Sequence, residues 1–450
     1  MTGGPTGLNG RLSLTSVVAF GISYMAPSLV MVMFGVVAAT SAGTAPTAFL
    51  LATAAMSLTA LSYAKMARRY PASGSAYAYA RKTLGAPAGF LVGWVVLLDY
   101  LFLPMVAWLV QAVYLNAQFP AVPVWAWMLL NAGLTSLVNV IGLALTDRVN
   151  KVLTGAAVLI VLLFAGYCLT HLAGHPPAST TAPLWNADST ALGVSAAAAV
   201  AAYSYLGFDA VTTLSEEARD PRRNIPLAVV LVVALGGLLF ASVAYVMQLV
   251  HPGGEFDAPD IAGYTMSVQV GGQVFADWTN LAGIVAGFGS GLAVQLSSSR
   301  LLYTMGRDGV LPKRFFGALN ARTGTPVYCV LLTGAMCFAG LGLTLETATS
   351  FINFGAFLAF TAVNICVVVH YARNRGAGRG TVLGHVVIPV LGACVTLYLM
   401  TQLSGRALLI GCCWLAAGIA YLLWLTRGFT RPTPELTTDE GHRRAETVRA

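Results

Sequence analysis

One aspartate lies inside a long apolar stretch of this sequence, directly after a glycine and a phenylalanine. Asp209 follows Gly207 and Phe208 within the apolar residues 191–214. A carboxylate is costly in such surroundings, and glycine lowers helix propensity. A helix interrupted in the middle of a membrane frees backbone N–H and C=O groups, which persist only where they line a protein cavity or hold a ligand. The residues therefore indicate a binding site inside a bilayer and not a catalytic centre.

Two roles are open for Asp209. A buried carboxylate favours either a proton or a cation, so Asp209 is predicted to be the counter-charge of a cationic substrate, a proton carrier, or both. The alternative is structural, with Asp209 capping the second half of a broken helix. Tyr203 and Leu206 precede the interruption and are predicted to line the same site.

A second interruption lies in the first apolar stretch, where Tyr24 is followed by Met25, Ala26, Pro27 and Ser28. Proline removes one backbone donor and frees a carbonyl one turn earlier. Taken alone, this pattern is equally typical of a kinked helix with no ligand, because membrane helices tolerate proline. Together with the interruption at Asp209, it predicts a substrate site between two broken helices.

A second acid, Asp99, lies deep in the third apolar stretch and is followed by Tyr100. Asp99 either bonds the backbone of a neighbouring helix or lies near the substrate or a proton path. No buried base neutralises Asp99 or Asp209 in the sequence pattern. The pair is therefore predicted to favour a cationic ligand or protons.

Two further acids, Glu216 and Glu217, follow the sixth apolar stretch. They are expected near its cytoplasmic exit. One interpretation is a gate closed by a salt bridge to Arg222 or Arg223, and the other is ordinary solvated charge.

Composition places this chain in a membrane. Hydrophobic residues make up 57% of the 450 and charged residues only 9%, whereas about 25% of the residues of a soluble domain are charged. Because a spanning helix needs about 20 apolar residues, the sequence predicts an all-α integral membrane protein with twelve transmembrane helices. These are expected at roughly residues 14–40, 43–67, 86–117, 124–146, 150–172, 191–215, 226–250, 273–304, 326–344, 347–371, 382–403 and 407–426.

Basic residues predict the orientation. All 25 lysines and arginines except Arg406 fall on one side if the N-terminus is cytoplasmic. This positive-inside asymmetry predicts that both termini are cytoplasmic. The net charge of +8 then reflects topology in a lipid bilayer, and no nucleic-acid partner is predicted because the basic residues are dispersed among loops. The seven cysteines and six histidines lack metal-binding spacing, so no metal and no cofactor is predicted.

The apolar stretches divide into two halves. If residues 14–172 and 191–371 are five-helix repeats, the interrupted helices one and six occupy corresponding positions, and the odd helix number inverts the second repeat. The remaining predicted segments are a cytoplasmic arm at 1–13, two further helices within 382–426 and a cytoplasmic tail at 427–450.

Three motifs carry a family resemblance. They are YPASGSAYAYARKTLG after helix two, YSYLGFDAVTTLSEEARDPRRNIP around helix six and SRLLYTMGRDGVLP after helix eight. With these, the chain resembles the amino acid–polyamine–organocation transporter superfamily over nearly its whole length. Within that superfamily it is most similar to bacterial putrescine importers, especially in GWVVLLDYLFLP and GFDAVTTLSEE.

The resemblance implies a LeuT-like fold of five plus five inverted helices, with helices one and six broken, and transport by alternating access. Substrate would lie between Met25–Ser28 and Leu206–Asp209, with Tyr203 in the position of a gating aromatic residue. The resemblance also implies a multi-pass protein of a bacterial inner membrane.

Two functions are compatible with these residues. The first is a secondary importer of a small organic amine, putrescine-like or an amino acid, coupled to protons or to sodium. The second is a permease or exchanger for zwitterionic amino acids, with the carboxylate on helix-one N–H groups and the amine on helix-six carbonyls. Nothing in the sequence indicates a receptor domain, and the broken helices argue against an open channel. An enzyme is not indicated either, because the sequence shows no metal ligands and no nucleophile–base set.

Topology can be tested directly. In a variant without native cysteines, we expect a cysteine at Thr180 to react with a membrane-impermeant thiol reagent from outside the cell. A cysteine at Glu435 should react only from the cytoplasmic side, because an even number of spans separates it from the cytoplasmic N-terminus. Reaction of both positions from the same side would contradict the helix count.

Overall fold

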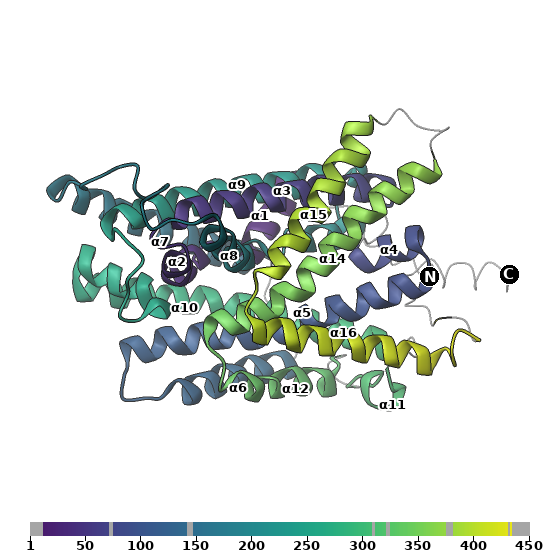
Figure 1. Ribbon diagram of the computed structural model, residues 1–450. Helices are drawn as coiled ribbons and strands as arrows, with labels where there is room; N and C mark the ends of the chain where they lie inside the picture. The colour runs from purple at the N-terminus through teal and green to yellow at the C-terminus, as the bar shows by residue number, and fades with distance from the viewer. Residues whose placement is uncertain are drawn as a thin grey trace.

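The computed structural model describes residues 12–71, 75–141, 147–307, 311–320, 325–374, 381–430 and 433. Across these ranges the chain is helical, with no β-strand beyond one isolated backbone bridge. Most of the long helices lie side by side along one axis (Figure 1). The predicted all-α class is therefore confirmed.

Ten helical spans of the described chain are long and apolar enough to cross a membrane, and a bent pair makes an eleventh. The bent pair is α1 (Leu14–Tyr24) and α2 (Leu29–Thr40), with an angle of 47° between them. The other spans contain α3 (Ala45–Arg69), α5 (Ala86–Gln118), α6 (Val124–Ile141), α7 (Asp147–Gly174), α8 (Ala191–Ala201), α9 (Pro221–Val250), α10 (Ala262–Arg307), α14 (Leu345–Arg373), α15 (Ile388–Thr401) and α16 (Gly405–Leu425).

The span predicted at 326–344 contains two shorter apolar helices, α12 (Val327–Ala335) and α13 (Cys337–Gly340). Together they fall below the length of the other spans. The count of twelve therefore stays a prediction at this segment.

Several helices begin at a side-chain cap or at a proline in the first turn. The Thr190 hydroxyl accepts a hydrogen bond from the Gly193 N–H at 3.0 Å and begins α8. The Ser404 hydroxyl does the same for the Ala407 N–H at 3.4 Å and begins α16. Proline occupies the first turn of α3, α5 and α9, where a missing N–H costs no helical hydrogen bond.

Helix α10 begins earlier than the predicted 273–304. Its backbone turns at Gly272, which has a φ of 78°. The arm before this turn packs on α2, because a Cβ at Gly263 would lie 2.5 Å from the Met31 carbonyl oxygen. Hydropathy alone missed the arm, since it is the left-handed glycine that lets the chain fold back onto α2.

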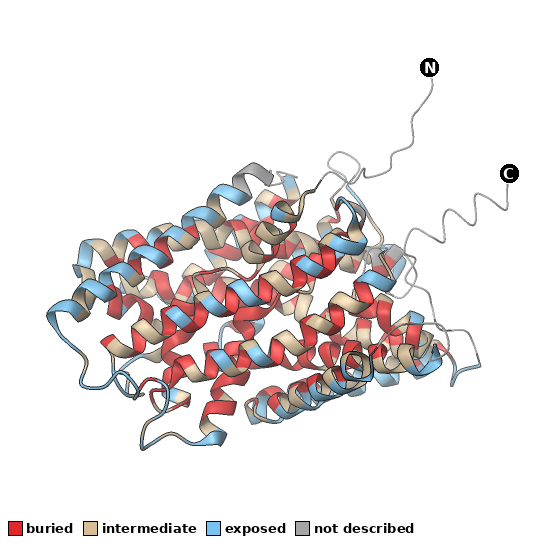
Figure 2. Ribbon diagram, turned by 90° about the horizontal axis from the view of Figure 1, so that it is seen from above, coloured by how far each residue is buried: buried red, intermediate tan, exposed pale blue. Residues whose placement is uncertain are grey.

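The outside of the bundle is apolar. Figure 2 shows buried residues gathered in the interior and exposed ones on the outward faces of the helices. Large exposed side chains on these faces include Leu238, Leu409 and Trp424, which are 68%, 67% and 73% exposed. An apolar exterior of this extent matches a protein whose solvent is a bilayer.

Polar contacts join helices at the end where the basic residues gather. The Arg373 guanidinium of α14 donates to the Thr83 carbonyl of α4 (Ala76–Leu84) at 2.5 Å. The Lys65 ammonium of α3 donates to the carbonyl of Gly384, in a π-helical turn, η4 (Leu383–Val387), before α15. These contacts hold α3, α4, α14 and α15 together at this end, which we call the basic end.

Candidate functional site

The first helix is broken at the predicted place. α1 ends at Tyr24, and the chain passes through Met25–Ser28 before α2 begins. Ala26 has a φ of 46°, a strained conformation for a residue with a side chain. The Ser28 side chain makes no capping hydrogen bond to α2. The N-terminus of α2, with its partial positive charge, therefore ends uncapped at the break.

The sixth helix is also broken as predicted. α8 passes into a 3-10 turn, η1 (Ala202–Tyr205), and a second 3-10 helix, η2 (Ala210–Glu216), follows the break. Gly207 between them has a φ of 105°, which residues with a Cβ rarely adopt. A 3-10 stretch inside a span often marks a functional hinge.

The two breaks are in contact. A Cβ on Gly207 would lie 2.0 Å from Tyr24 Cδ1, so the tyrosine ring rests on the glycine backbone. No other amino acid allows this approach together with the φ of Gly207. Glycine is therefore required at position 207 for two reasons, the left-handed backbone conformation and the close contact with the Tyr24 ring.

The structure brings the two intramembrane acids together. Asp99 and Asp209 lie within electrostatic range of each other and of Tyr24 and Tyr100. Both acids keep some exposed surface in the middle of apolar spans. The Asp99 Oδ1 atom is buried and has no hydrogen-bond partner within the described part of the chain. Two close carboxylates in a poorly solvated interior favour a proton or a cation between them.

Capping does not explain Asp209. The residue directly precedes η2, but its side chain makes no capping hydrogen bond. The backbone N–H groups that interact with the carboxylate belong to Gly207 and Asp209, in the break, and to Ala210, the first residue of η2. The carboxylate is therefore oriented by the backbone of the break and of the first residue of η2.

A proline in α5 fixes the region around Asp99. Pro104 lacks the N–H that would bond the Tyr100 carbonyl one turn earlier. The Ser298 hydroxyl of α10 donates to that carbonyl and is also in reach of the Val294 carbonyl at 2.8 Å. The freed backbone group thus links α5 to α10 beside Asp99.

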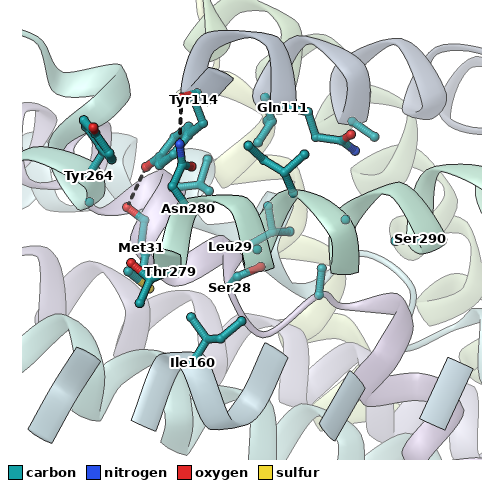
Figure 3. A pocket seen from close by; sticks show the side chains of 18 of the residues that line it. Ser28, Leu29, Met31, Gln111, Tyr114, Ile160, Tyr264, Thr279, Asn280 and Ser290 are labelled. Carbon is teal, nitrogen blue, oxygen red and sulfur yellow. Dashed lines mark hydrogen bonds between the residues drawn. The ribbon is translucent and has the colours of Figure 1, made fainter. Parts of the chain in front are cut away.

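A cavity of about 130 Å³ opens from the two breaks toward the first arm of α10. Figure 3 shows side chains of α2, α5, α7 and α10 converging on it. None of its lining residues is charged. They are Tyr24, Ala26, Ser28, Leu29, Met31, Val32, Leu103, Ala107, Val110, Gln111, Tyr114, Ile160, Tyr203, Leu206, Gly263, Tyr264, Ser267, Ala276, Thr279, Asn280, Gly283, Ile284, Gly287, Ser290 and Val294.

Five predicted site residues line this cavity, namely Tyr24, Ala26, Ser28, Tyr203 and Leu206. Pro27, Asp99, Tyr100, Gly207 and Asp209 lie outside its lining. For all of these residues, substrate binding stays a prediction.

Two of the predicted residues face the packed core. The Met25 side chain points to α9, where a Cβ on Gly236 would lie 2.5 Å from its Cε atom. The Phe208 ring packs on Tyr63 at 5.6 Å and on Phe360 at 5.1 Å between ring centroids. Both side chains hold the breaks in place from behind.

Sequence analysis missed the contribution of the second half of α10. Gly283, Gly287 and Gly291 recur at four-residue spacing and so share one helix face. Gly283 and Gly287 line the cavity beside Gln111 of α5. The spacing is visible in the sequence, but only the packing of α5 and α10 assigns the face to a cavity.

The other end of the two breaks is closed by backbone pairing. The Leu12 N–H donates to the Glu217 carbonyl, and the Arg219 N–H donates to the Leu12 carbonyl, both at 2.9 Å. Among the described side chains, Glu217 forms no ion pair with Arg222 or Arg223. The gating role of Glu217 stays a prediction.

The side chain of Glu216 lies outside the described part of the structure, so its predicted gating role is untested. Among the residues that the structure describes, no three His, Cys, Asp or Glu side chains are placed to hold a metal ion.

The sequence profile of the amino acid permease family matches residues 12–411. This chain belongs to that family, within the amino acid–polyamine–organocation superfamily. The predicted family is confirmed, and with it the LeuT-like fold and a transporter, not an enzyme. The chain is a multi-pass membrane permease.

The permease is similar to three characterised proteins over more than nine-tenths of each chain. It is 34% identical to the low-affinity putrescine importer PlaP of Escherichia coli strain K12 over 434 residues, which cover 95% of this chain and 96% of that protein. Identity is 29% over 435 residues with the methylthioribose transporter of Bacillus subtilis strain 168, covering 92% and 93%. It is 25% over 447 residues with the branched-chain amino acid permease BcaP of the same strain, covering 94% of each.

The contact between the breaks gives a testable prediction. We expect Gly207→Ala to lower uptake at least tenfold, because the added Cβ meets the Tyr24 ring and the left-handed φ disfavours alanine. The measurement is uptake of a radiolabelled amine into proteoliposomes at matched protein content.

Gly166→Ala is the matched control for this variant. Gly166 is an exposed helical glycine of α7, and a Cβ there would meet no atom within 4 Å. It should transport like the unmodified protein. Normal uptake by Gly207→Ala would show that the Tyr24–Gly207 contact is dispensable.

Proposed function

We propose that this permease is a secondary active transporter that imports a small organic amine by alternating access, coupled to protons. A putrescine-like polyamine or an amino acid is the substrate. The observation that carries the proposal is the pair Asp99 and Asp209, which lie within electrostatic range of each other beside the broken helices. One buried Asp99 oxygen has no partner among the described residues.

An ammonium group fits this acid pair. It supplies both the positive charge and the N–H donors that an unpartnered carboxylate oxygen lacks. The carbonyl end of α8 and η1 adds negative potential at the same break. The similarity to a protein named as a putrescine importer supports a cationic amine.

A zwitterionic amino acid is the second candidate. The N-terminus of α2, which the Ser28 side chain does not cap, offers partial positive charge to a substrate carboxylate. The ammonium group would then take the acid pair. The similarity to a protein named as a branched-chain amino acid permease favours this candidate.

Alternating access is supported by the asymmetry around the breaks. A cavity adjoins them on the side of the α10 arm. At the basic end, two backbone hydrogen bonds of Leu12 hold the start of α1 to the chain after η2. Opening the basic end would break these bonds, and the strained residues Ala26 and Gly207 are suited to act as the hinges.

Proton coupling follows from the acids themselves. When Asp209 is ionised it holds an ammonium group, and when it is protonated the empty site can close without an unpaired charge.

Competition tests the substrate. Unlabelled putrescine, arginine and leucine should be compared as inhibitors of labelled putrescine uptake and of labelled leucine uptake into proteoliposomes. We expect putrescine to be taken up and to be the strongest inhibitor. Leucine uptake that putrescine does not inhibit would favour the zwitterionic substrate, and uptake of none of these compounds would contradict the proposal.

The acid pair gives a second prediction. We expect Asp209→Asn to lower uptake at least tenfold and to remove its pH dependence, because asparagine keeps the volume but neither titrates nor carries charge. Initial rates should be measured between pH 5 and pH 8 with an imposed proton gradient. If the variant kept full uptake with unchanged pH dependence, Asp99 and not Asp209 would be assigned as the central charged residue of the site.

A further inference from the structure

One buried side chain of the cavity is left without a partner. Gln111 of α5 is 5% exposed and lines the cavity. Its Oε1 atom is buried and accepts no hydrogen bond from the described residues. A buried acceptor without a donor is unfavourable, so the geometry requires a donor from water or from a ligand. Figure 3 places Gln111 among the cavity side chains of α5.

The facing helix leaves room for such a ligand. A Cβ on Gly287 of α10 would lie 3.4 Å from Gln111 Nε2, and a Cβ on Gly291 would lie 3.8 Å from it. A Cβ on Gly283 would meet no atom within 4 Å. The glycine face of α10 therefore borders the Nε2 atom of the Gln111 amide, where it adds no side chain.

Gln111 and Asp99 lie too far apart along α5 to bind the same small molecule. At 1.5 Å per residue, roughly 18 Å of helix rise separates the Asp99 and Gln111 backbone positions on α5. A four-carbon diamine is less than half that length. Gln111 and the acid pair therefore belong to two successive binding positions.

Tyr24 lies between these two positions. It lines the uncharged cavity, and it also lies within electrostatic range of Asp99 and Asp209. Its ring rests on Gly207 at the break. Tyr203 also lines the cavity and lies within electrostatic range of Asp99, so two tyrosine rings stand between the cavity and the acids.

We propose that Gln111 forms a first binding subsite, in which its amide oxygen accepts a hydrogen bond from the ammonium group of the substrate before the substrate passes Tyr24. This deepens the proposed function and rests on the substrate being an amine. The subsite selects molecules that carry N–H donors. It favours a cation over an anion, because its lining contains no cationic residue and its unpartnered atom is an acceptor.

Transport kinetics test the subsite. Uptake of putrescine, or of leucine if competition identifies it as the substrate, is measured in proteoliposomes for the unmodified protein, Gln111→Leu and Gln111→Asn. Gln111→Leu keeps the volume and removes the acceptor, and it should raise the half-saturation concentration roughly tenfold with the maximal rate within about twofold. Gln111→Asn keeps an amide and should give an intermediate value.

Glycine variants test the space beside the amide. Gly287→Ala adds a methyl group at ordinary contact distance from Gln111, so it should fold and should weaken uptake of the same substrate several-fold. Gly133→Ala of α6 is the matched control, since Gly133 is exposed and a Cβ there would meet no atom within 4 Å. It should leave the half-saturation concentration unchanged.

Binding separates this proposal from the role of the acids. Asp209→Asn in nanodiscs should retain weak equilibrium binding of the labelled substrate, and adding Gln111→Leu should reduce that binding further. If Asp209→Asn transports normally while Gln111→Leu still raises the half-saturation concentration, the acid assignment fails and the subsite stands. If the half-saturation concentration of Gln111→Leu stayed within twofold of that of the unmodified protein, the subsite would be overturned. The hydrogen-bond partner of the Gln111 amide would then be a bound water molecule.

Discussion

Unpaired backbone groups cannot face hydrocarbon, and this constraint governs the centre of the permease. Breaks in α1–α2 and α8–η2 are tolerated only where protein or ligand surrounds them. The structure meets this condition by setting the breaks against each other, with the Tyr24 ring on Gly207. Behind them, Phe208 packs between Tyr63 and Phe360 and shields the same region.

The same constraint explains how α5 joins the site. Pro104 opens the Tyr100 carbonyl, and the Ser298 hydroxyl of α10 satisfies it. A residue that weakens a helix in water here becomes a point of attachment between helices. Asp99, one residue before Tyr100, is thereby held on a fixed stretch of backbone beside the second acid.

The charged residues Asp99 and Asp209 and the uncharged hydrogen-bonding residues of the cavity occupy different places. The cavity next to the breaks is lined by uncharged residues, whereas Asp99 and Asp209 lie outside its lining and within electrostatic range of Tyr24. In the proposed mechanism an amine therefore loses its hydration water in two steps, first against neutral acceptors and then against carboxylates. Dividing the desolvation in this way avoids a single large barrier for a charged substrate.

The sequence by itself determined the all-helical membrane class, the family, the positions of both breaks and the presence of two acids inside apolar spans. Hydropathy, glycine, proline and intramembrane charge are local signals, and each has a local physical cost. Only the tertiary structure decided that Met25 and Phe208 face the core, that Asp209 caps no helix and that Gln111 borders a cavity. Those outcomes depend on which helix face meets which neighbour, and a nearly uniform apolar composition carries little periodicity from which to read that pairing.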